Sequence, residues 1–196
     1  MPKIVESEFI IFDVETTGLS PRWGDRIVEI AALKIKNLKI IERFETLVNP
    51  EREISYGAFR VNGITQSMVQ DAPKAVKVLP DFLEFMGEGC LVGHNVNFDL
   101  GFLHQELSLA GHSSLMGKMA LDTIRMAKGF LPPLPSYSLS SLVYALSLDR
   151  QQTHRAMSDV ELTLQVFLHL VKVAQQRNVD NLEQLVRLFG YRLGKR

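Results

Sequence analysis

Two carboxylates interrupt an apolar segment near the start of the chain. Residues 10–19 read IIFDVETTGL, so Asp13 and Glu15 are two positions apart in a segment with the composition of a buried strand. Side chains two residues apart in an extended chain point to the same face, so both carboxylates converge on one place. Close carboxylates repel each other unless a cation lies between them, and Mg²⁺ commonly takes carboxylate ligands. The pair favours a metal site, although a strand end whose acids face solvent would give the same pattern.

Further acids and one histidine stand where helices are expected to begin. The sequence GHNVNFD at 93–99 follows a short apolar segment and leads into a helical pattern, which places Asp99 in the first helical turn. In HRAMSD at 154–159, His154 starts a second helical pattern and Asp159 lies a little over one turn further on. An acid in a first turn can simply complement the helix dipole, and His154 could be a surface residue. The positions of all five residues at strand ends or helix starts favour one shared site.

The strands that must position these residues follow in a clear order. The sequence predicts a buried strand at 9–14, a strand of alternating character at 26–35 and a third strand at 39–48, with a turn near Asn37. These three strands make an antiparallel meander. A short apolar strand is expected at 89–93. Three antiparallel strands followed by alternating strands and helices imply an α/β fold with a mixed central sheet and flanking helices.

Helical spacing and proline positions predict the remaining elements. Asn97 is expected to cap the helix that carries Asp99, and three prolines place a loop at 129–135. The expected helices cover residues 73–86, 98–110, 137–146, 156–174 and 181–189. Apolar residues of the last helix could pack on the core or dock on a partner, and we favour the core.

Composition limits the class of protein. The chain has 196 residues, of which 46% are hydrophobic and 22% charged, so we expect a single domain over 1–196 with a sizeable core. The only cysteine, Cys90, has apolar neighbours, which indicates a buried thiol in a reducing compartment. We find no signal peptide and no apolar run of membrane-spanning length, so a cytoplasmic protein is expected. A formal net charge of zero disfavours a protein that coats long duplexes, but not one that grips a single end.

The three motifs together resemble those of the DEDDh (DnaQ-like) 3′–5′ exonucleases. DVETTGL at 13–19, HNVNFD at 94–99 and HRAMSD at 154–159 are similar, in order, to the three exonuclease motifs of this family. The similarity is greatest to its proofreading branch, the epsilon subunit and the C-type exonuclease domain of bacterial DNA polymerase III, which LDT at 121–123 and SYSL at 136–139 also resemble. One departure is Asn62, because many relatives have a histidine before GIT at 63–65.

The resemblance implies a fold and a catalytic centre. The fold would be ribonuclease H-like, with a central mixed sheet of five strands. Two divalent ions, Mg²⁺ or Mn²⁺, would be held by Asp13, Glu15, Asp99 and Asp159, and paired metals can clamp the attacking and leaving oxygens of a phosphodiester. His154 would be the general base that takes a proton from the attacking water, a task that suits imidazole because it exchanges protons near neutral pH.

The resemblance also indicates where the substrate would bind. Backbone amides after Glu15 would hold the terminal nucleotide while Leu19 wedges against its base, although Leu19 could instead fold onto the core. Phe98 could stack on a base or be the first core residue of its helix, and His94 would orient its loop by hydrogen bonds. The expected substrate contacts are Thr16, Thr17, Gly18, Leu19, Asn95 and Phe98.

The implied function is removal of nucleoside monophosphates from single-stranded or frayed DNA 3′ ends, in replication proofreading or repair. An RNA exonuclease of the same superfamily remains an alternative, because such relatives use the same five residues. A non-catalytic module that binds nucleic acid or a polymerase is the alternative from another class. The expected partners are a nucleic acid 3′ end and a DNA polymerase subunit, and no membrane.

Overall fold

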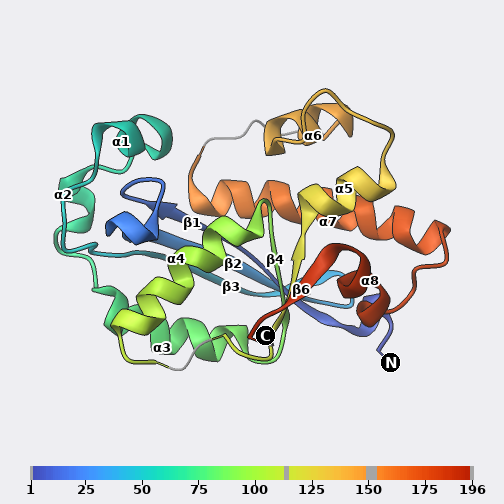
Figure 1. The fold of residues 1–196 in the computed structure, drawn as a ribbon, viewed down its shortest axis with the longest axis horizontal. Helices are drawn as coiled ribbons and strands as arrows, with labels where there is room; N and C mark the ends of the chain where they lie inside the picture. Colours follow the sequence, from blue (N-terminus) through green and yellow to red (C-terminus); the bar gives the residue numbers. More distant parts are fainter. Residues whose placement is uncertain (1, 113–114, 149–153, 195–196) are drawn as a thin grey trace.

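A six-stranded mixed sheet forms the centre of the molecule (Figure 1). The computed structural model describes residues 2–112, 115–148 and 154–194. The sheet has the order β3-β2-β1-β4-β5-β6, in which the first three strands are antiparallel, β4 and β5 join in parallel, and β6 pairs antiparallel with β5. The strands are β1 (Glu8–Thr16), β2 (Ile27–Lys36), β3 (Lys39–Leu47), β4 (Cys90–Gly93), β5 (Met119–Asp122) and β6 (Gly190–Arg192).

The predicted α/β class and antiparallel meander are confirmed, and the number of strands is one higher than expected. Asn37 and Leu38 have φ values of 52° and 57°, the left-handed conformation that closes a tight hairpin between β2 and β3. The sixth strand, β6, has three residues and is antiparallel, so it adds a short edge to the five strands that were predicted. It was missed because so short a segment carries no periodic pattern.

Helices cover both faces of the sheet. The described α-helices are α1 (Tyr56–Asn62), α2 (Gln66–Val69), α3 (Ala75–Met86), α4 (Val96–Leu109), α5 (Thr123–Phe130), α6 (Leu139–Ala145), α7 (Ala156–Gln176) and α8 (Leu182–Phe189). Two short 3₁₀ helices, η1 (Ile4–Glu6) and η2 (Pro21–Trp23), flank β1. In the described parts of the chain, no helix combines the length and apolar character needed to cross a bilayer.

The alternation of β1 divides the core into two layers. Phe9 and Ile11 pack with α5, α6, α7 and α8, whereas Ile10, Phe12 and Val14 pack with α3 and α4 on the other face. Asp13 and Glu15 therefore share the strand face of Phe9 and Ile11, which is covered by α7. Asp159 lies on α7, so the two layers alone bring these three acids to one side of the sheet.

Several element boundaries differ from the prediction. Helix α4 begins two residues before the predicted start, with Asn95 as its N-cap residue at φ 67°, and Asn97 instead donates to the Tyr191 hydroxyl at 2.9 Å. Helix α5 was not predicted and extends to Phe130, so the proline-rich loop begins at Leu131 and not at residue 129. Helices α1 and α2 were also missed.

The C-terminal helix and the cysteine lie where they were expected. Leu182, Leu185 and Val186 of α8 are buried, so this helix packs on the domain's own core. Cys90 is 1% exposed, and burial raises the pKa of its thiol, as expected for an unreactive core cysteine.

Candidate active site

Three of the predicted metal ligands meet between β1 and α7. Carboxylate oxygens of Asp13, Glu15 and Asp159 all lie within 4.8 Å of one another. Asp13 and Glu15 come from one face of β1, and Asp159 from the first turn of α7. The three oxygens are close enough to share a single cation, which is the arrangement that the sequence predicted for these residues.

Asp99 lines the same cavity but its carboxylate has a second task. Its Oδ1 accepts a hydrogen bond from the backbone N–H of Val14 at 3.1 Å. Pairing between β1 and β4 ends at Ile11 and Val92, so β4 offers the Val14 N–H no acceptor and the Asp99 carboxylate supplies one. Asp99 thus fixes the start of α4 against β1, next to the group that Asp13, Glu15 and Asp159 form.

His154 stands at the mouth of the site, two residues before α7. Its Nδ1 is 3.9 Å from Asp159 Oδ2, and half of its side chain is exposed. Its backbone has a φ of 52°, in the left-handed region that non-glycine residues seldom adopt. The histidine therefore reaches the acidic cluster from the solvent side.

A partly buried ion pair, which the sequence reasoning missed, fixes the start of α7. Glu29 of β2 is 1% exposed and lies directly opposite Glu15 in the antiparallel register. Its carboxylate accepts hydrogen bonds from Arg155 Nη2 at 2.6 Å and Nε at 3.2 Å, and from the Ala156 backbone N–H at 3.0 Å. Because Arg155 follows His154 directly, this contact also places the histidine.

The acidic cluster is electrostatically unfavourable without a cation. Burial, and then the neighbouring carboxylates of Asp99, Glu15, Asp159 and Glu29, raise the pKa of Asp13 well above its usual range. Burial and the charges of Asp159 and Glu29 raise the pKa of Glu15 to about 8, and burial raises that of Asp99 to about 8. Removing such charges from water is costly unless they are paired or bind a metal. An all-carboxylate donor set of this kind fits a hard divalent cation.

The cluster opens into a cavity of about 570 Å³ that most of the predicted substrate residues line. Leu19 is 85% exposed, so it does not fold onto the core, and Phe98 is partly buried beside Phe102 with a ring separation of 5.0 Å. Asn95 is exposed and lies at the same cavity. The predicted substrate residues that line the cavity are Thr16, Gly18, Leu19, Asn95 and Phe98.

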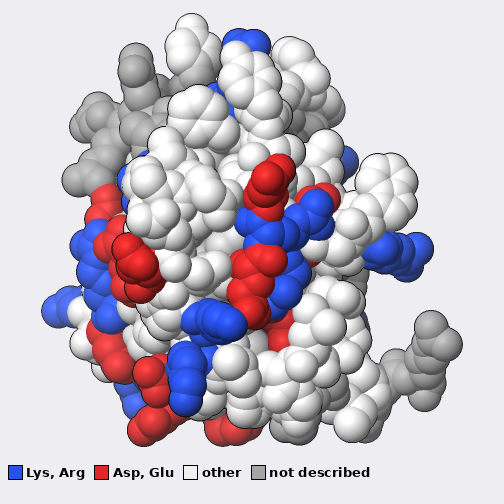
Figure 2. Space-filling model, turned by 90° about the vertical axis from the view of Figure 1, so that its left-hand side faces the viewer, with Lys and Arg blue, Asp and Glu red and all other residues white. Residues whose placement is uncertain are grey.

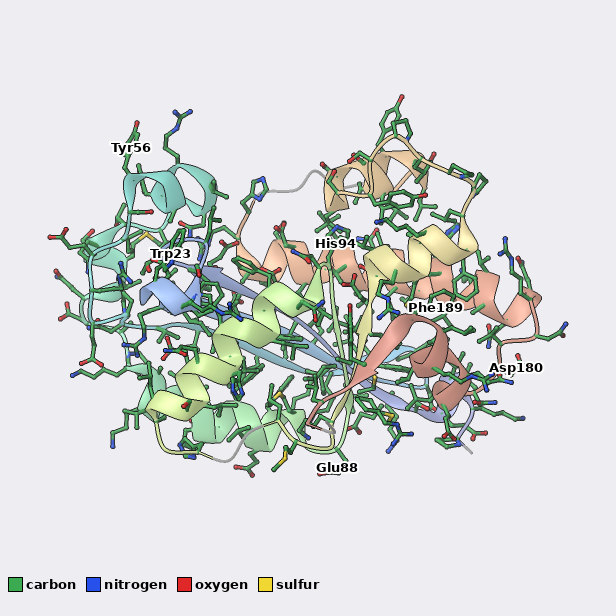
Figure 3. All side chains as sticks on the ribbon, in the orientation of Figure 1. Trp23, Tyr56, Glu88, His94, Asp180 and Phe189 are labelled. Atoms are coloured by element: carbon green, nitrogen blue, oxygen red, sulfur yellow. The ribbon has the colours of Figure 1, made fainter. Side chains whose placement is uncertain are left out.

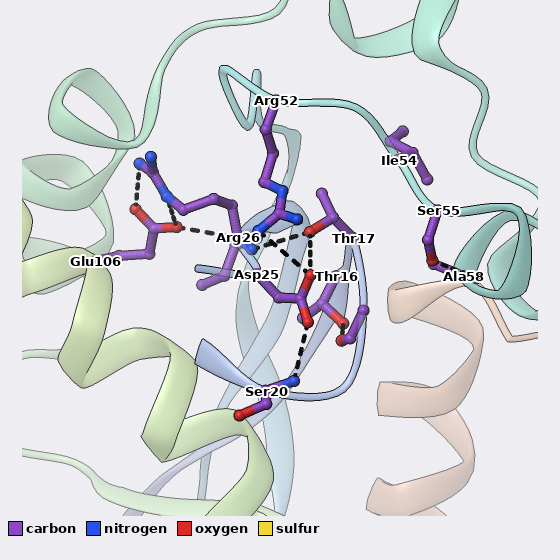
Figure 4. A network of polar contacts seen from close by, with 12 residues as sticks. Thr16, Thr17, Ser20, Asp25, Arg26, Arg52, Ile54, Ser55, Ala58 and Glu106 are labelled. Atoms are coloured by element: carbon purple, nitrogen blue, oxygen red, sulfur yellow. Dashed lines mark hydrogen bonds and ion pairs between the residues drawn. The ribbon is translucent and has the colours of Figure 1, made fainter. Parts of the chain in front are cut away.

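Thr17 fixes the turn after β1, which carries several of the predicted substrate residues. It is fully buried, its N–H donates to Arg26 O at 2.9 Å, and its hydroxyl donates to Asp25 Oδ1 at 3.1 Å. Asp25 Oδ2 also accepts from the Ser20 N–H, which closes the turn (Figure 4). Direct contact between Thr17 and a nucleotide stays a prediction that this geometry does not favour, because both donors of Thr17 are already used.

The turn has no room for a side chain at position 18. A Cβ atom on Gly18 would collide with the Asp25 carboxylate. Arg52 adds a contact to Asp25 Oδ1 at 3.4 Å, from the segment that leads to α1. Gly18 and Asp25 thus determine how the turn approaches the acidic cluster.

His94 and Asn62 complete the cavity wall. His94, labelled in Figure 3, has its Nδ1 2.9 Å from the Thr123 hydroxyl, so the predicted orienting hydrogen bond is present. Burial lowers the pKa of its imidazole. Asn62 is buried and donates to Thr16 O at 3.3 Å, so it holds the strand end just after Glu15. The residue that replaces the histidine of many relatives is therefore part of the same wall.

The mixed sheet and the acidic cluster that it carries belong to an exonuclease. A family model named RNase_T and described as "Exonuclease" matches residues 10–167, and this chain belongs to that family. The resemblance to the DEDDh exonucleases that the motifs indicated is confirmed.

The curated relatives include PolC-type DNA polymerase III and a 3′–5′ exonuclease. The chain is 38% identical over 181 residues to the PolC-type DNA polymerase III of Caldanaerobacter subterraneus subsp. tengcongensis, and 37% identical over 183 residues to the 3′–5′ exonuclease DinG of Bacillus subtilis. These alignments cover 92% and 93% of this chain but only 13% and 20% of the relatives. The chain therefore spans a small part of the length of these proteins.

Solved structures support the fold. Exonuclease X, determined in complex with 5′-overhanging duplex DNA, superimposes with a TM-score of 0.70 at 26% identity, over 92% of this chain and 98% of that one. Exonuclease I of E. coli, in complex with a dA16 oligonucleotide, gives a TM-score of 0.76 at 23% identity over 88% of this chain and 42% of that one, a similarity of fold alone.

Proposed function

We propose that residues 1–196 act as a single 3′–5′ exonuclease domain that releases nucleoside monophosphates from single-stranded or frayed DNA 3′ ends. The observation that carries this proposal is the meeting of Asp13, Glu15 and Asp159 within 4.8 Å, with His154 at 3.9 Å from Asp159. Residues 1, 113–114, 149–153, 195 and 196 of this proposed domain lie outside the described residues.

The chemistry requires metal ions that the donor set fits. Two divalent cations, Mg²⁺ or Mn²⁺, would supply Lewis acidity at the scissile phosphate and favour ionisation of the attacking water. Asp13, Glu15 and Asp159 would hold them, together with Asp99, which has one oxygen engaged with Val14 N–H and a second for a cation.

His154 would remove the proton from the attacking water. Its half-exposed ring can pass the proton to solvent, and the Glu29–Arg155 contact keeps its backbone in place. Leu19 and Phe98 would contact the terminal base, and Asn95 the sugar, since these side chains line the cavity beside the acids.

The relatives suggest a cellular setting. PolC-type polymerases and DinG support a role in replication proofreading or in repair, with a DNA polymerase subunit as a candidate partner and the cytoplasm as the compartment. The chain covers only a small part of these relatives, so the role, the partner and the compartment are proposed for it and not taken from them.

The direct test is digestion of a 5′-labelled single-stranded DNA beside a matched RNA, in Mg²⁺ or Mn²⁺ and in EDTA. We expect a metal-dependent ladder that shortens from the 3′ end, with DNA cleaved faster than RNA. Faster cleavage of RNA would move the protein to the RNA branch of the family. Absence of cleavage by folded protein in either metal would overturn the exonuclease proposal in favour of a binding module.

A further inference from the structure

Exposed apolar side chains gather at the mouth of the catalytic cavity. Leu19 and Trp23 are each 85% exposed and Val61 is 56% exposed, and all three line the cavity that contains Asp13 and Asp159. They come from three separate segments: the turn after β1, η2 and α1. Large apolar side chains brought together on a surface commonly mark a binding site.

The segment that carries Trp23 is held rigidly. Pro21 fixes the first position of η2, and Gly24 closes it at φ 80°, a conformation that favours glycine. The Trp23 N–H donates to Ser20 O at 3.1 Å, and Ser20 N–H in turn donates to Asp25. Trp23 is therefore displayed on a fixed support below α1 (Figure 3), not on a loose loop.

The described wall of the cavity lacks the cationic side chains that commonly bind the phosphates of a nucleic acid. None of the described residues that line the cavity is lysine or arginine, and the ionisable side chains among them are the acids and histidines of the site. Among the described residues at this end of the molecule, uncharged side chains predominate in the upper part of the view, whereas charged side chains gather lower down (Figure 2). The described lining therefore offers the phosphates of a nucleic acid strand no lysine or arginine partner, and part of the binding must come from contacts to the bases.

We propose that Trp23, with Leu19 and Val61, forms a stacking surface for unpaired nucleobases next to the scissile phosphate. Every base has a π-face, so aromatic stacking binds single strands with little sequence preference. Paired bases inside a duplex cannot present that face, so the surface would select an unpaired 3′ end. This inference rests on the proposed function, because it names the substrate form that the same site selects.

Trp23 is the only tryptophan in the chain, so its fluorescence reports binding directly. The probe is a short oligo(dT) whose 3′-terminal linkages are phosphorothioates, which slows hydrolysis in Mg²⁺. We expect this oligonucleotide to quench the fluorescence, and the same strand with abasic nucleotides near its 3′ end to quench it much less. Unchanged fluorescence while a fluorescent label on the oligonucleotide reports binding would overturn the inference.

Kinetics of variants provide the second test. Trp23→Ala should raise KM for single-stranded DNA by about 5- to 100-fold, as expected for loss of one stacked base, whereas Trp23→Phe should retain most of the binding. Tyr144→Ala is the matched control, because Tyr144 is an 88% exposed aromatic residue on α6 that does not line this cavity. The side chains of Trp23 and Tyr144 are largely exposed, so all three variants should unfold at the temperature of the wild type.

The two proposals fail in different ways. An active wild-type enzyme whose KM is the same in Trp23→Ala would overturn the stacking surface and leave the exonuclease proposal intact. A wild-type protein that binds the oligonucleotide with quenching but never cleaves DNA would support the stacking surface and overturn the catalytic proposal.

Discussion

The carboxylates of the site repel one another unless a cation lies between them. This repulsion should make the stability of the metal-free protein depend on pH. In the folded protein the pKa values of Glu15 and Asp99 rise to about 8 from ordinary values of 4.5 and 3.8. Between these limits the folded protein without metal binds protons that the unfolded chain has lost. The contribution of these two groups to stability is therefore complete below their ordinary pKa values, and it is lost as the pH rises through their pKa values in the folded protein.

We expect the unfolding temperature in EDTA to fall as the pH is raised from about 5 to about 9. Mg²⁺ or Mn²⁺ should raise it more at the alkaline end than at the acidic end, because metal ions replace the protons. Glu15→Gln should flatten the EDTA profile. An unfolding temperature that rises with pH in EDTA would contradict the electrostatic description.

For His154 we predict an effect on the rate of the reaction and none on the binding of metal or DNA. Replacing it with alanine should lower kcat by about 100- to 10,000-fold, the usual contribution of a general base, while KM and Mn²⁺ affinity remain close to wild type. Steady-state kinetics and titration calorimetry provide these values. Loss of metal binding in His154→Ala would assign the residue to the metal site and refute its role as base.

Single residues could be predicted where a local pattern reports on them. The spacing of Asp13 and Glu15 in a strand, and of Asp159 in a first helical turn, predicts the faces that meet in the structure. Glu29 was missed because its partner Arg155 is 126 positions away. A signal existed, since a lone acid inside an apolar strand must be paired if it is buried.

At the scale of elements, the ion pair between β2 and α7 should position the catalytic histidine. Arg155→Ala leaves the buried Glu29 carboxylate with only the Ala156 N–H, and we expect a loss of roughly 2–3 kcal/mol in stability, less than for a fully buried pair because Arg155 is partly exposed. kcat should fall more than KM rises, since His154 loses its support.

Arg177→Ala is the control for this prediction. Arg177 joins the far end of α7 to the carbonyls of Gly129 and Phe130. Its loss should reduce stability without a specific change in kcat. Equal effects of the two variants on kcat would show that Arg155 acts only through general stability.

The turn between β1 and η2 provides a second prediction about an element. Gly18→Ala would force the Asp25 carboxylate away and should cost about 1–3 kcal/mol of stability, with a raised KM because Leu19 and Trp23 shift. Gly101→Ala in α4 is the control, because its Cβ would make only an ordinary contact with Pro21, and helix propensity makes it neutral or slightly stabilising. Urea unfolding and KM measurement test both, and a Gly18→Ala variant of unchanged stability and KM would refute this account of the turn.

Long elements with a strong period were all predicted, whereas the short ones were predicted only in part. The three long strands and the helices α3, α4 and α7 follow from their apolar periodicity, whereas α1, α2 and β6 have seven, four and three residues. The start of α4 was misplaced because Asn95 adopts a left-handed backbone conformation and begins the helix there. Such a start depends on contacts with β1 that no local pattern contains.

At the scale of the whole molecule, the sheet separates two core layers and leaves the acids at one end of the interface between β1 and α7. Family membership, fold and acidic cluster agree, and the proposed function requires that these acids hold divalent cations for hydrolysis at a 3′ end. The relatives are several times longer than this chain, so their polymerase or other activities offer no test of that claim.

The most direct test is the rate of nucleoside monophosphate release from single-stranded DNA over a range of Mg²⁺ concentrations, for wild type and Asp13→Ala. Asp180→Ala, which removes an exposed acid far from the site (Figure 3), is the control. Circular dichroism verifies that each variant is folded. We predict Mg²⁺-dependent release by wild type and Asp180→Ala, and a rate at least about 100-fold lower for Asp13→Ala at every concentration. Release by folded Asp13→Ala at the wild-type rate would contradict the account.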